Sequence, residues 1–277
     1  MKRVLLSLMG CMIFSFLSAQ SNLNIITFNV RYANNQDTGY LWPDRREKVA
    51  LLPRFHQAGI LCTQEVLQEQ KEDLLRLLPG WNVVGVGRDD GKQAGEYSAI
   101  FYDAARFIPV KNGHFWLSEN PEKPAIGWDA VCIRICTWIC LKEKSTGKQF
   151  FVFNTHFDHV GKLAQANSAR LILDKIKQIA KGNYPVILTG DFNMTPGNEA
   201  INLIKQKLND SRDVTQLPPY GPEGTFNGFK FDTSIKDRID YIFVNKKVTV
   251  CRYGVLTDSK DNKFFSDHLP VLAGLKF

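Results

Sequence analysis

The chain has 277 residues, of which 44% are hydrophobic, 12% are aromatic and 23% are charged, and its formal net charge is +7. This length and composition are sufficient for a sizeable core and favour one large domain over two small ones. The sequence has no low-complexity tract, no detectable repeat and no segment resembling a nucleic-acid-binding tail. Repeat architectures and a basic nucleic-acid-binding arm are therefore excluded, whereas an anionic substrate is compatible with the charge.

The start of the chain has the pattern of a secretory signal peptide. Lys2 and Arg3 precede a largely apolar run, residues 4–17, and Ser18-Ala19-Gln20 follows it. The apolar run is too short to span a bilayer comfortably, which disfavours a retained membrane anchor.

We therefore expect residues 1–20 to be a signal peptide and residues 21–277 to be exported to the periplasm or the cell exterior. Residues 8–11 resemble a lipoprotein box only faintly, so lipidation is the disfavoured alternative. Removal of the signal peptide lowers the formal charge from +7 to +5, because two basic residues are lost.

Strand and helix patterns alternate along the mature chain without a break in composition, which indicates a single α/β domain. Pro53 is expected to kink or shorten the first helix. Residues 209–236 are predicted to form a long surface loop and residues 257–266 a shorter polar one. Helices are predicted near residues 44–57, 67–78, 162–181 and 198–208. Strands are predicted near residues 24–30, 60–64, 81–87, 97–102, 106–115, 130–142, 149–155, 185–190, 239–244, 248–256 and 270–277.

Polar residues cluster at the ends of the predicted strands. Residues 186–189 form an apolar, β-branched run, and Gly190 allows a turn after it. Asp191 and Asn193 should share the exposed face, while Phe192 between them points into the core. Such strand-end groups are how open α/β sheets build sites. Polar residues also stand next to the ends of other apolar runs: Asn29 and Arg31, Gln64-Glu65, Asn154-Thr155-His156, Asp240, and Asp267-His268.

Seven motifs follow one another along the chain: Thr27–Arg31, Gln64-Glu65, Glu96–Ser98, Asn154–His156, Gly190–Asn193, Arg238–Tyr241 and Ser266–His268. In this order they resemble the endonuclease/exonuclease/phosphatase superfamily, from about Asn24 to Phe277. That family includes pancreatic-type deoxyribonucleases, abasic-site endonucleases, inositol polyphosphate phosphatases, neutral sphingomyelinases and deadenylases. Phe115–Glu119, with Arg134 after it, looks like a bacterial branch whose substrates are poorly defined.

The resemblance implies the fold and the position of the site. The expected architecture is an α/β four-layer sandwich of the deoxyribonuclease type, with two β-sheets packed face to face and helices on the outside. The site would lie at one end of the sandwich. The same resemblance implies hydrolysis of phosphoester bonds.

Phosphoester hydrolysis favours a hard divalent cation with oxygen ligands, because charge builds up on the phosphoryl and leaving oxygens. The resemblance implies Glu65 as the leading metal ligand, and the alternative is a surface glutamate that opens the following helix. Asp267 is the next carboxylate candidate, and Asn29 could complete or orient the coordination sphere. The few histidines and the lack of a Cys-X-X-Cys pair argue against zinc, so Mg²⁺ or Mn²⁺ is expected.

Two acid–histidine pairs also follow from the resemblance. Asp240 should accept a hydrogen bond from one ring nitrogen of His268, and Glu96 could do the same for His156. A carboxylate partner favours the imidazolium form, which binds phosphate or donates a proton.

Asp191 is then the best candidate to orient or deprotonate the attacking water, with Asn193 donating to phosphate oxygens. The division of this work between His156 and Asp191 stays open, because histidines take more of it in the deoxyribonuclease branch. For His56, His114 and His159, an ordinary structural role is favoured. The expected substrate-binding residues are Asn29, Arg31, Arg134, Asn193 and His268.

The mature chain keeps five cysteines. Cys132, Cys136 and Cys140 lie in one alternating segment, and cysteines four apart in a strand are about 13 Å apart, too far to form a disulfide. Free thiols are therefore favoured over disulfides or a metal role. The other two are Cys62 and Cys251.

The sequence thus predicts a secreted, metal-dependent phosphoester hydrolase that uses Mg²⁺ or Mn²⁺ and water activated by Asp191. A phosphodiesterase is favoured, whether a nuclease or a lipid or sugar phosphodiesterase, and a phosphomonoesterase is also open. The expected partner is a phosphoester: nucleic acid, a phospholipid headgroup or a sugar phosphate. No stable protein partner is evident, and a monomer is expected. The alternative is a weakly active or inactive binding module of the same fold that recognises a glycan or phospholipid.

Overall fold

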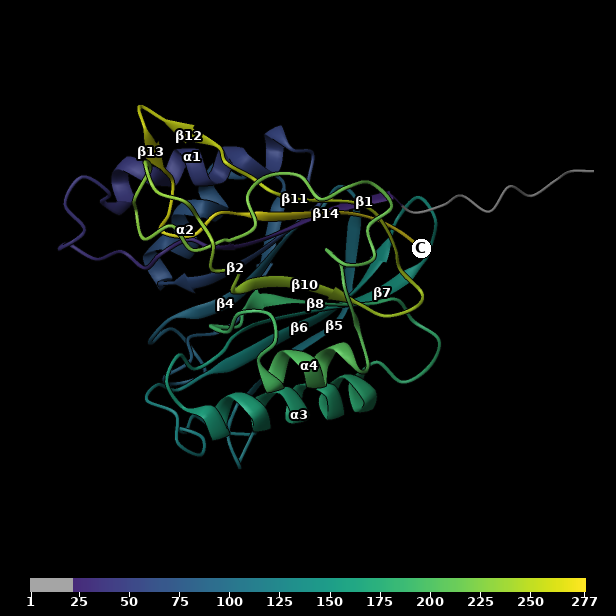
Figure 1. Cartoon of the computed structure of the whole chain (residues 1–277). Helices are drawn as coiled ribbons and strands as arrows, with labels where there is room; N and C mark the ends of the chain where they lie inside the picture. The colour runs from purple at the N-terminus through teal and green to yellow at the C-terminus, as the bar shows by residue number, and fades with distance from the viewer. Residues whose placement is uncertain (1–21) are drawn as a thin grey trace, which may run out of the picture.

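The structure, a computed structural model, describes residues 22–277. The expected signal peptide, residues 1–20, lies outside the described residues. Two six-stranded β-sheets pack face to face, and helices cover both outer faces (Figure 1). This arrangement confirms the predicted four-layer sandwich.

The first sheet has six strands. These are β1 (Asn22–Asn29), β2 (Ile60–Val66), β3 (Trp81–Val84), β4 (Tyr97–Asp103), β11 (Thr249–Val255) and β14 (Val271–Lys276). Their order across the sheet is β11-β14-β1-β2-β4-β3, and only β1 and β2 run parallel. Helices α1 (Trp42–Phe55) and α2 (Gln68–Leu77) lie on its outer face (Figure 1).

The second sheet also has six strands. These are β5 (Phe107–Trp116), β6 (Ile135–Glu143), β7 (Gln149–His156), β8 (Val186–Asp191), β9 (Asn209–Asp210) and β10 (Asp240–Val244). Their order is β5-β6-β7-β8-β10-β9, and only β7 and β8 run parallel. Helices α3 (Lys162–Ile179) and α4 (Glu199–Lys205) lie on the face away from the first sheet (Figure 1).

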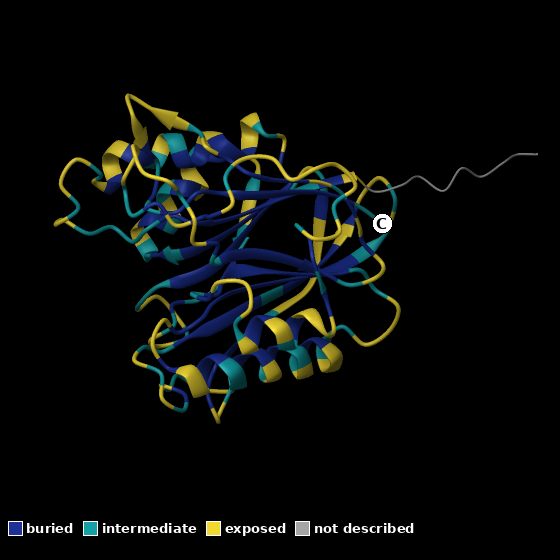
Figure 2. Cartoon of the chain, viewed as in Figure 1, coloured by how far each residue is buried: buried dark blue, intermediate teal, exposed yellow. Residues whose placement is uncertain are grey.

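Buried apolar side chains form three clusters, one between the sheets and one beneath each pair of helices. The strands of both sheets are mostly buried, whereas the helices have exposed residues on their outer sides (Figure 2). Strands β2, β7 and β8 are buried on both faces, which explains their nearly continuous apolar runs. Phe192 is fully buried and meets Tyr241 and Phe243 edge to face. Burial of a side chain this size contributes about 1.5–3 kcal/mol, which anchors the turn that carries Asp191 and Asn193.

The strand directions bring the polar motifs to one end of the sandwich. The parallel pairs β1–β2 and β7–β8 end there, and β10 begins there. Asp191 is level with His156 on one neighbouring strand and with Asp240 on the other. Gly190 is required for a second reason besides the turn, because a Cβ at this position would overlap the carbonyl group of Thr155.

The structure corrects some details of the predicted elements. Strand β6 begins at Ile135 rather than near residue 130, because the backbone N–H groups of Val131 and Cys132 bond to the Asp158 carboxylate instead of a neighbouring strand. Helix α1 contains Pro53 and ends at Phe55, two residues before its predicted end, in line with the expected shortening. The predicted loop 257–266 contains a small hairpin of β12 (Ser259–Lys260) and β13 (Lys263–Phe264).

The five cysteines in the described part of the chain are free, as predicted. Among residues 22–277, no helix combines the length and apolar character needed to cross a membrane.

Candidate active site

The predicted motifs converge on one cavity of about 560 Å³. It contains most of the predicted site residues, and Asn29 and Asp240 contact its lining from behind. The cavity is lined by Arg31, Tyr32, Glu65, Arg88, Glu96, Cys132, Arg134, His156, His159, Asp191, Asn193, Phe226, Ile239, Asp267 and His268.

His268 and Asp240 form the predicted acid–histidine pair. The Nδ1 atom of His268 is 2.9 Å from Oδ2 of Asp240, and both residues are buried. Burial alone would lower the pKa of His268, but the carboxylates of Asp240 and Asp191 outweigh it and hold that pKa well above the ordinary value. The ring is therefore an imidazolium, and its Nε2 lies 3.7 Å from Oδ2 of Asp191.

Asp191 is a buried carboxylate whose two oxygens each accept a hydrogen bond. Its Oδ2 accepts from Nδ2 of Asn29 at 3.0 Å, and its Oδ1 accepts from the backbone N–H of Asn193 at 2.8 Å. Burial and the charge of Asp240 raise its pKa, while His268 and the two hydrogen bonds oppose the rise. A carboxylate whose pKa is raised toward neutrality is suited to general-base catalysis.

Asn29 orients carboxylates in this arrangement and does not present its oxygen to the cavity. Its Oδ1 accepts from the backbone N–H of Arg31 at 3.0 Å. Its Nδ2 therefore faces the acids, donating to Glu65 at 2.9 Å as well as to Asp191. Of the two roles considered for Asn29 at the metal, the geometry favours orientation over ligation, and its amide hydrogens are not directed at substrate.

Glu65 and Asp267 fit the requirements of a divalent cation site. Both line the cavity, and Arg31 lies 3.9 Å from a Glu65 oxygen and 4.0 Å from an Asp267 oxygen. Burial and the charge of Glu65 raise the pKa of Asp267, with His268 opposing. A hard cation held by two carboxylate oxygens would relieve this repulsion. A β-bulge between Thr63 and Val66 directs Glu65 into the cavity rather than onto the following helix.

Glu96 is not the hydrogen-bonding partner of His156, which corrects the second predicted pair. Arg88 binds both carboxylate oxygens of Glu96, at 2.7 and 2.9 Å, so Glu96 lies 3.9 Å from Nδ1 of His156. Burial, with Arg134 and Arg88 acting in the same direction, lowers the pKa of His156 well below its ordinary value. His156 is therefore a neutral imidazole rather than the expected imidazolium.

Asn193 does not point its amide at phosphate, a second correction. Its Nδ2 donates to Nε2 of His156 and to the carbonyl oxygen of Phe157, both at 3.0 Å. These bonds use both amide hydrogens, so Asn193 fixes the ring of His156 instead. The neutral ring must then carry its proton on Nδ1, which is buried without a hydrogen-bond acceptor among the described residues.

The backbone is strained at the site. Arg31, Glu65 and Asn193 have φ angles of 58°, 61° and 53°, in the left-handed region that residues other than glycine seldom adopt. Arg31 and Asn193 follow the ends of β1 and β8, Glu65 lies near the end of β2, and all three line the cavity. Strain of this kind, on the order of 1–3 kcal/mol per residue, is concentrated at functional sites.

The sequence reasoning missed Arg88 and gave His159 only a structural role. Arg88 lies in a glycine-rich segment with no strand or helix pattern, so the sequence contains no signal for it. His159 lines the cavity, and its Nδ1 accepts a hydrogen bond from Arg134 at 3.2 Å. A signal for His159 was present in its position directly after Asp158, three residues beyond the end of β7. His56, for which no partner was expected, lies 3.0 Å from Asp258.

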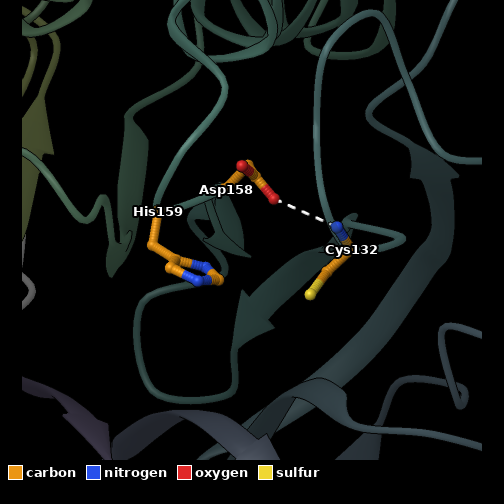
Figure 3. Close-up of side chains that lie close together, drawn as sticks. All are labelled: Cys132, Asp158 and His159. Atoms are coloured by element: carbon orange, nitrogen blue, oxygen red, sulfur yellow. Dashed lines mark hydrogen bonds between the residues drawn. The ribbon is translucent and has the colours of Figure 1, made fainter.

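Two further groups of side chains bring metal-type ligand atoms together. In one, Cys132, Asp158 and His159 surround a small space (Figure 3). The Asp158 carboxylate there already accepts four backbone N–H bonds, which leaves it poorly placed to bind a cation. The other group, Asp191, Asp240 and His268, contains a protonated ring without a free lone pair.

Solved structures with the same fold come from Bacteroides thetaiotaomicron. An endonuclease/exonuclease/phosphatase family protein is 41% identical with a TM-score of 0.91, covering 94% of this chain and 99% of its own. A mannosyl-6-phosphatase is 43% identical with a TM-score of 0.89, covering 92% of this chain and 100% of its own. A curated relative, the uncharacterized protein L388 of Acanthamoeba polyphaga mimivirus, is 27% identical, covering 84% of this chain and 91% of its own.

The family model described as "Endonuclease/Exonuclease/phosphatase family" matches residues 26–268, which span both sheets and every strand-end motif. The match therefore includes the cavity as well as the fold. The chain belongs to the endonuclease/exonuclease/phosphatase family.

Proposed function

We propose that the protein is an exported, metal-dependent phosphatase that hydrolyses a sugar phosphate monoester. The observation that carries this proposal is the cavity in which Asp191 and protonated His268 lie beside a wall formed by Arg88 and Arg134. The 43% identity to a mannosyl-6-phosphatase supports a sugar as the group that bears the phosphate. This choice departs from the sequence-based prediction, which favoured a phosphodiesterase and left a phosphomonoesterase open.

Each side chain has a defined task in this mechanism. Glu65 and Asp267 would hold Mg²⁺ or Mn²⁺, and such an ion neutralises charge on the phosphoryl and leaving oxygens when bound. Asp191, oriented by Asn29, accepts a proton from the attacking water. His268, kept charged by Asp240, donates from Nε2 to a phosphoryl oxygen.

His156 takes a supporting role. As a neutral ring fixed by Asn193, it lies 3.5 Å from Oδ2 of Asp191. It therefore lines the cavity beside Asp191 without adding a second positively charged ring to that of His268. We therefore assign the role of general base, which the sequence left open between His156 and Asp191, to Asp191.

Substrate turnover tests the proposal. Purified residues 21–277 are assayed with Mg²⁺ and with Mn²⁺ for phosphate release from mannose 6-phosphate, and for cleavage of bis-p-nitrophenyl phosphate. We expect the monoester to be the better substrate by kcat/KM, with His268→Ala as the inactive control. Preference for the diester would make the protein a phosphodiesterase instead. Binding of sugar phosphates by folded protein without any turnover would support the binding-module alternative.

Export rests on the pattern of residues 1–20 alone. The test is mass spectrometry of the protein recovered from the periplasm or medium of an expressing bacterium. We expect a mature N-terminus at residue 20 or 21. Full-length protein retained in the cytoplasm would contradict the proposal.

A further inference from the structure

The cavity has a cationic end next to His156, and Arg134 is its main component. Arg134 is 5% exposed and lines the cavity. Its Nε atom is buried and has no hydrogen-bond acceptor among residues 22–277. A buried charged donor that lacks an acceptor is costly, because it has lost its water and gained no bond in return.

The nearest carboxylate does not satisfy Arg134. Asp158 lies 3.8 Å from its Nε, beyond hydrogen-bond reach. The four lone-pair positions of Asp158 are used by the backbone N–H groups of Val131, Cys132, Val160 and Gly161, as its contact with Cys132 illustrates (Figure 3). Asp158 therefore shapes the loop and is not a dedicated partner for the guanidinium.

Glu96 is the other carboxylate near Arg134, and both of its oxygens are bound by Arg88. His159 accepts from Nη2 of Arg134 through Nδ1, which leaves its own proton on Nε2. Arg88 is nearby, and its two terminal nitrogens are committed to Glu96. The charges of Arg134, Arg88 and His159 all act to lower the pKa of His156.

Arg134 lies just before the start of a strand that is two positions away from the strand carrying Asp191 in the second sheet. Residue 134 immediately precedes β6, whereas His156 ends β7 and Asp191 ends β8. Neighbouring strands are about 4.8 Å apart, so the strands that carry Arg134 and Asp191 are roughly 10 Å apart. That spacing is comparable to the length of a hexose with an anionic group at each end.

We propose that Arg134, together with His159, forms a second anion subsite that binds a phosphate or carboxylate group carried by the sugar, at the end opposite the phosphate that is cleaved. The inference rests on the proposed phosphatase function and names a narrower substrate class for it. Arg134 supplies a permanent positive charge and its Nε–H as a hydrogen-bond donor to the anion. His159 positions the guanidinium through Nδ1 and contributes its Nε2–H as a second donor. The favoured substrate is thus doubly anionic.

Matched substrate pairs test this directly. With Mg²⁺ present, mannose 6-phosphate is compared with mannose 1,6-bisphosphate, and glucose 6-phosphate with 6-phosphogluconate. We expect the doubly anionic member to have a kcat/KM higher by on the order of 10- to 100-fold, the scale of a buried charge-assisted hydrogen bond. The bisphosphate and the phosphogluconate arms distinguish a phosphate from a carboxylate at the second position.

Arg134→Met should lower kcat/KM at least ten-fold more for the doubly anionic member than for the singly anionic member, which removes the advantage of the second anion. The matched control is Arg170→Met, which removes the same charge from the exposed face of α3. Equal losses on both members of a pair would overturn the subsite, since Arg134 would then hold the phosphate that is cleaved. If Arg134→Met does not fold, His159→Leu replaces it and should reduce the advantage in the same direction.

A binding measurement separates the subsite from the proposed function. Calorimetric titration of the Mg²⁺-loaded protein with inorganic phosphate should give two sites, one lost in Arg134→Met and the other in His268→Ala. The wild-type protein could hydrolyse none of the sugar phosphates and still bind phosphate at two sites, one of which is absent in Arg134→Met. In that case the phosphatase proposal fails and the anion subsite stands. Phosphate binding that is unchanged in Arg134→Met would overturn the subsite.

Discussion

The two acid–histidine pairs of this protein look alike in sequence and differ in the folded chain. His268 is bonded to Asp240, and the combined charge of Asp240 and Asp191 keeps it protonated. His156 has a carboxylate at 3.9 Å, but Arg88 holds that carboxylate and the ring is neutral. A carboxylate raises the pKa of a neighbouring histidine only if that carboxylate is not already bound to a stronger cation such as an arginine.

The difference divides the cavity into two functional halves. The half around His268 combines a cation with three carboxylates, Asp191, Asp240 and Asp267, and is suited to chemistry at a metal-bound phosphate. The half around His156 combines a neutral ring with Arg88 and Arg134 and is suited to holding an anion. The predictions below test this division.

The largest effect is expected at Asp191, which the two halves share. Asp191→Asn should lower kcat by on the order of 10²-fold or more, because the amide cannot accept the proton of water. Fold and substrate binding should survive, since the amide is nearly isosteric and removes a buried charge. Turnover of the best substrate is measured beside the melting temperature. A folded variant with near wild-type turnover would remove Asp191 from the mechanism.

Asp240→Asn and Glu96→Gln compare the two pairs directly. Asp240→Asn should lower kcat/KM by on the order of 10²-fold, because His268 loses the charge that protonates and orients it. Glu96→Gln should cost roughly ten-fold or less, because His156 does not depend on Glu96 for its state. Asp240→Asn should also be strongly non-additive with His268→Ala, as for residues that act as a unit. Additive losses, or equal losses for the two acids, would show that the pairs do not differ as described.

Glu65→Gln tests the metal assignment on the acidic side. A neutral amide is a poorer ligand for a hard cation, so activity should require more Mg²⁺ or Mn²⁺, by roughly ten-fold or more in the half-saturating concentration. Titrating each ion against both proteins measures this shift, and Glu122→Gln, on an exposed side chain, is the matched control. Full activity after exhaustive EDTA treatment would contradict a metal-dependent reaction.

The smallest effects concern protonation of the two rings. In NMR titration of the metal-free protein, His268 should stay protonated above the ordinary histidine pKa of about 6.5, and His156 should stay neutral below it. Arg88→Met should raise the pKa of His156, because it removes a nearby positive charge and frees Glu96. Two rings that both titrate near pH 6.5 would contradict the assigned states.

The raised pKa of His268 also predicts how the free energy of unfolding depends on pH. Because the pKa of His268 is raised on folding, its protonation stabilises the fold fully below about pH 6.5, and this contribution is lost as the pH rises through the folded-state pKa. His268→Gln should therefore reduce the free energy of unfolding more at pH 6 than at alkaline pH. A constant difference across this range would show that the ring is not charged in the folded protein.

Much of the fold followed from short-range patterns. Apolar runs such as 186–190 and 149–155 predicted strands within a residue or two of β8 and β7, because strands buried on both faces need continuous apolar sequence. The start of β6 was misplaced because a distant carboxylate, Asp158, takes the backbone N–H groups of residues 131 and 132. Local periodicity contains no information about such a competitor.

The sequence by itself determined the family, the sandwich and most residues of the site, because the strand-end motifs and their order are visible in the sequence, but it did not reveal Arg88. Only the tertiary structure decided what each group does. Arg88 binds Glu96, both amide hydrogens of Asn193 are used within the protein, and the Nε atom of Arg134 is buried without an acceptor among residues 22–277. The physical reason is that protonation state and hydrogen-bond direction depend on burial and on neighbours far away in sequence, and both are set only when the two sheets pack.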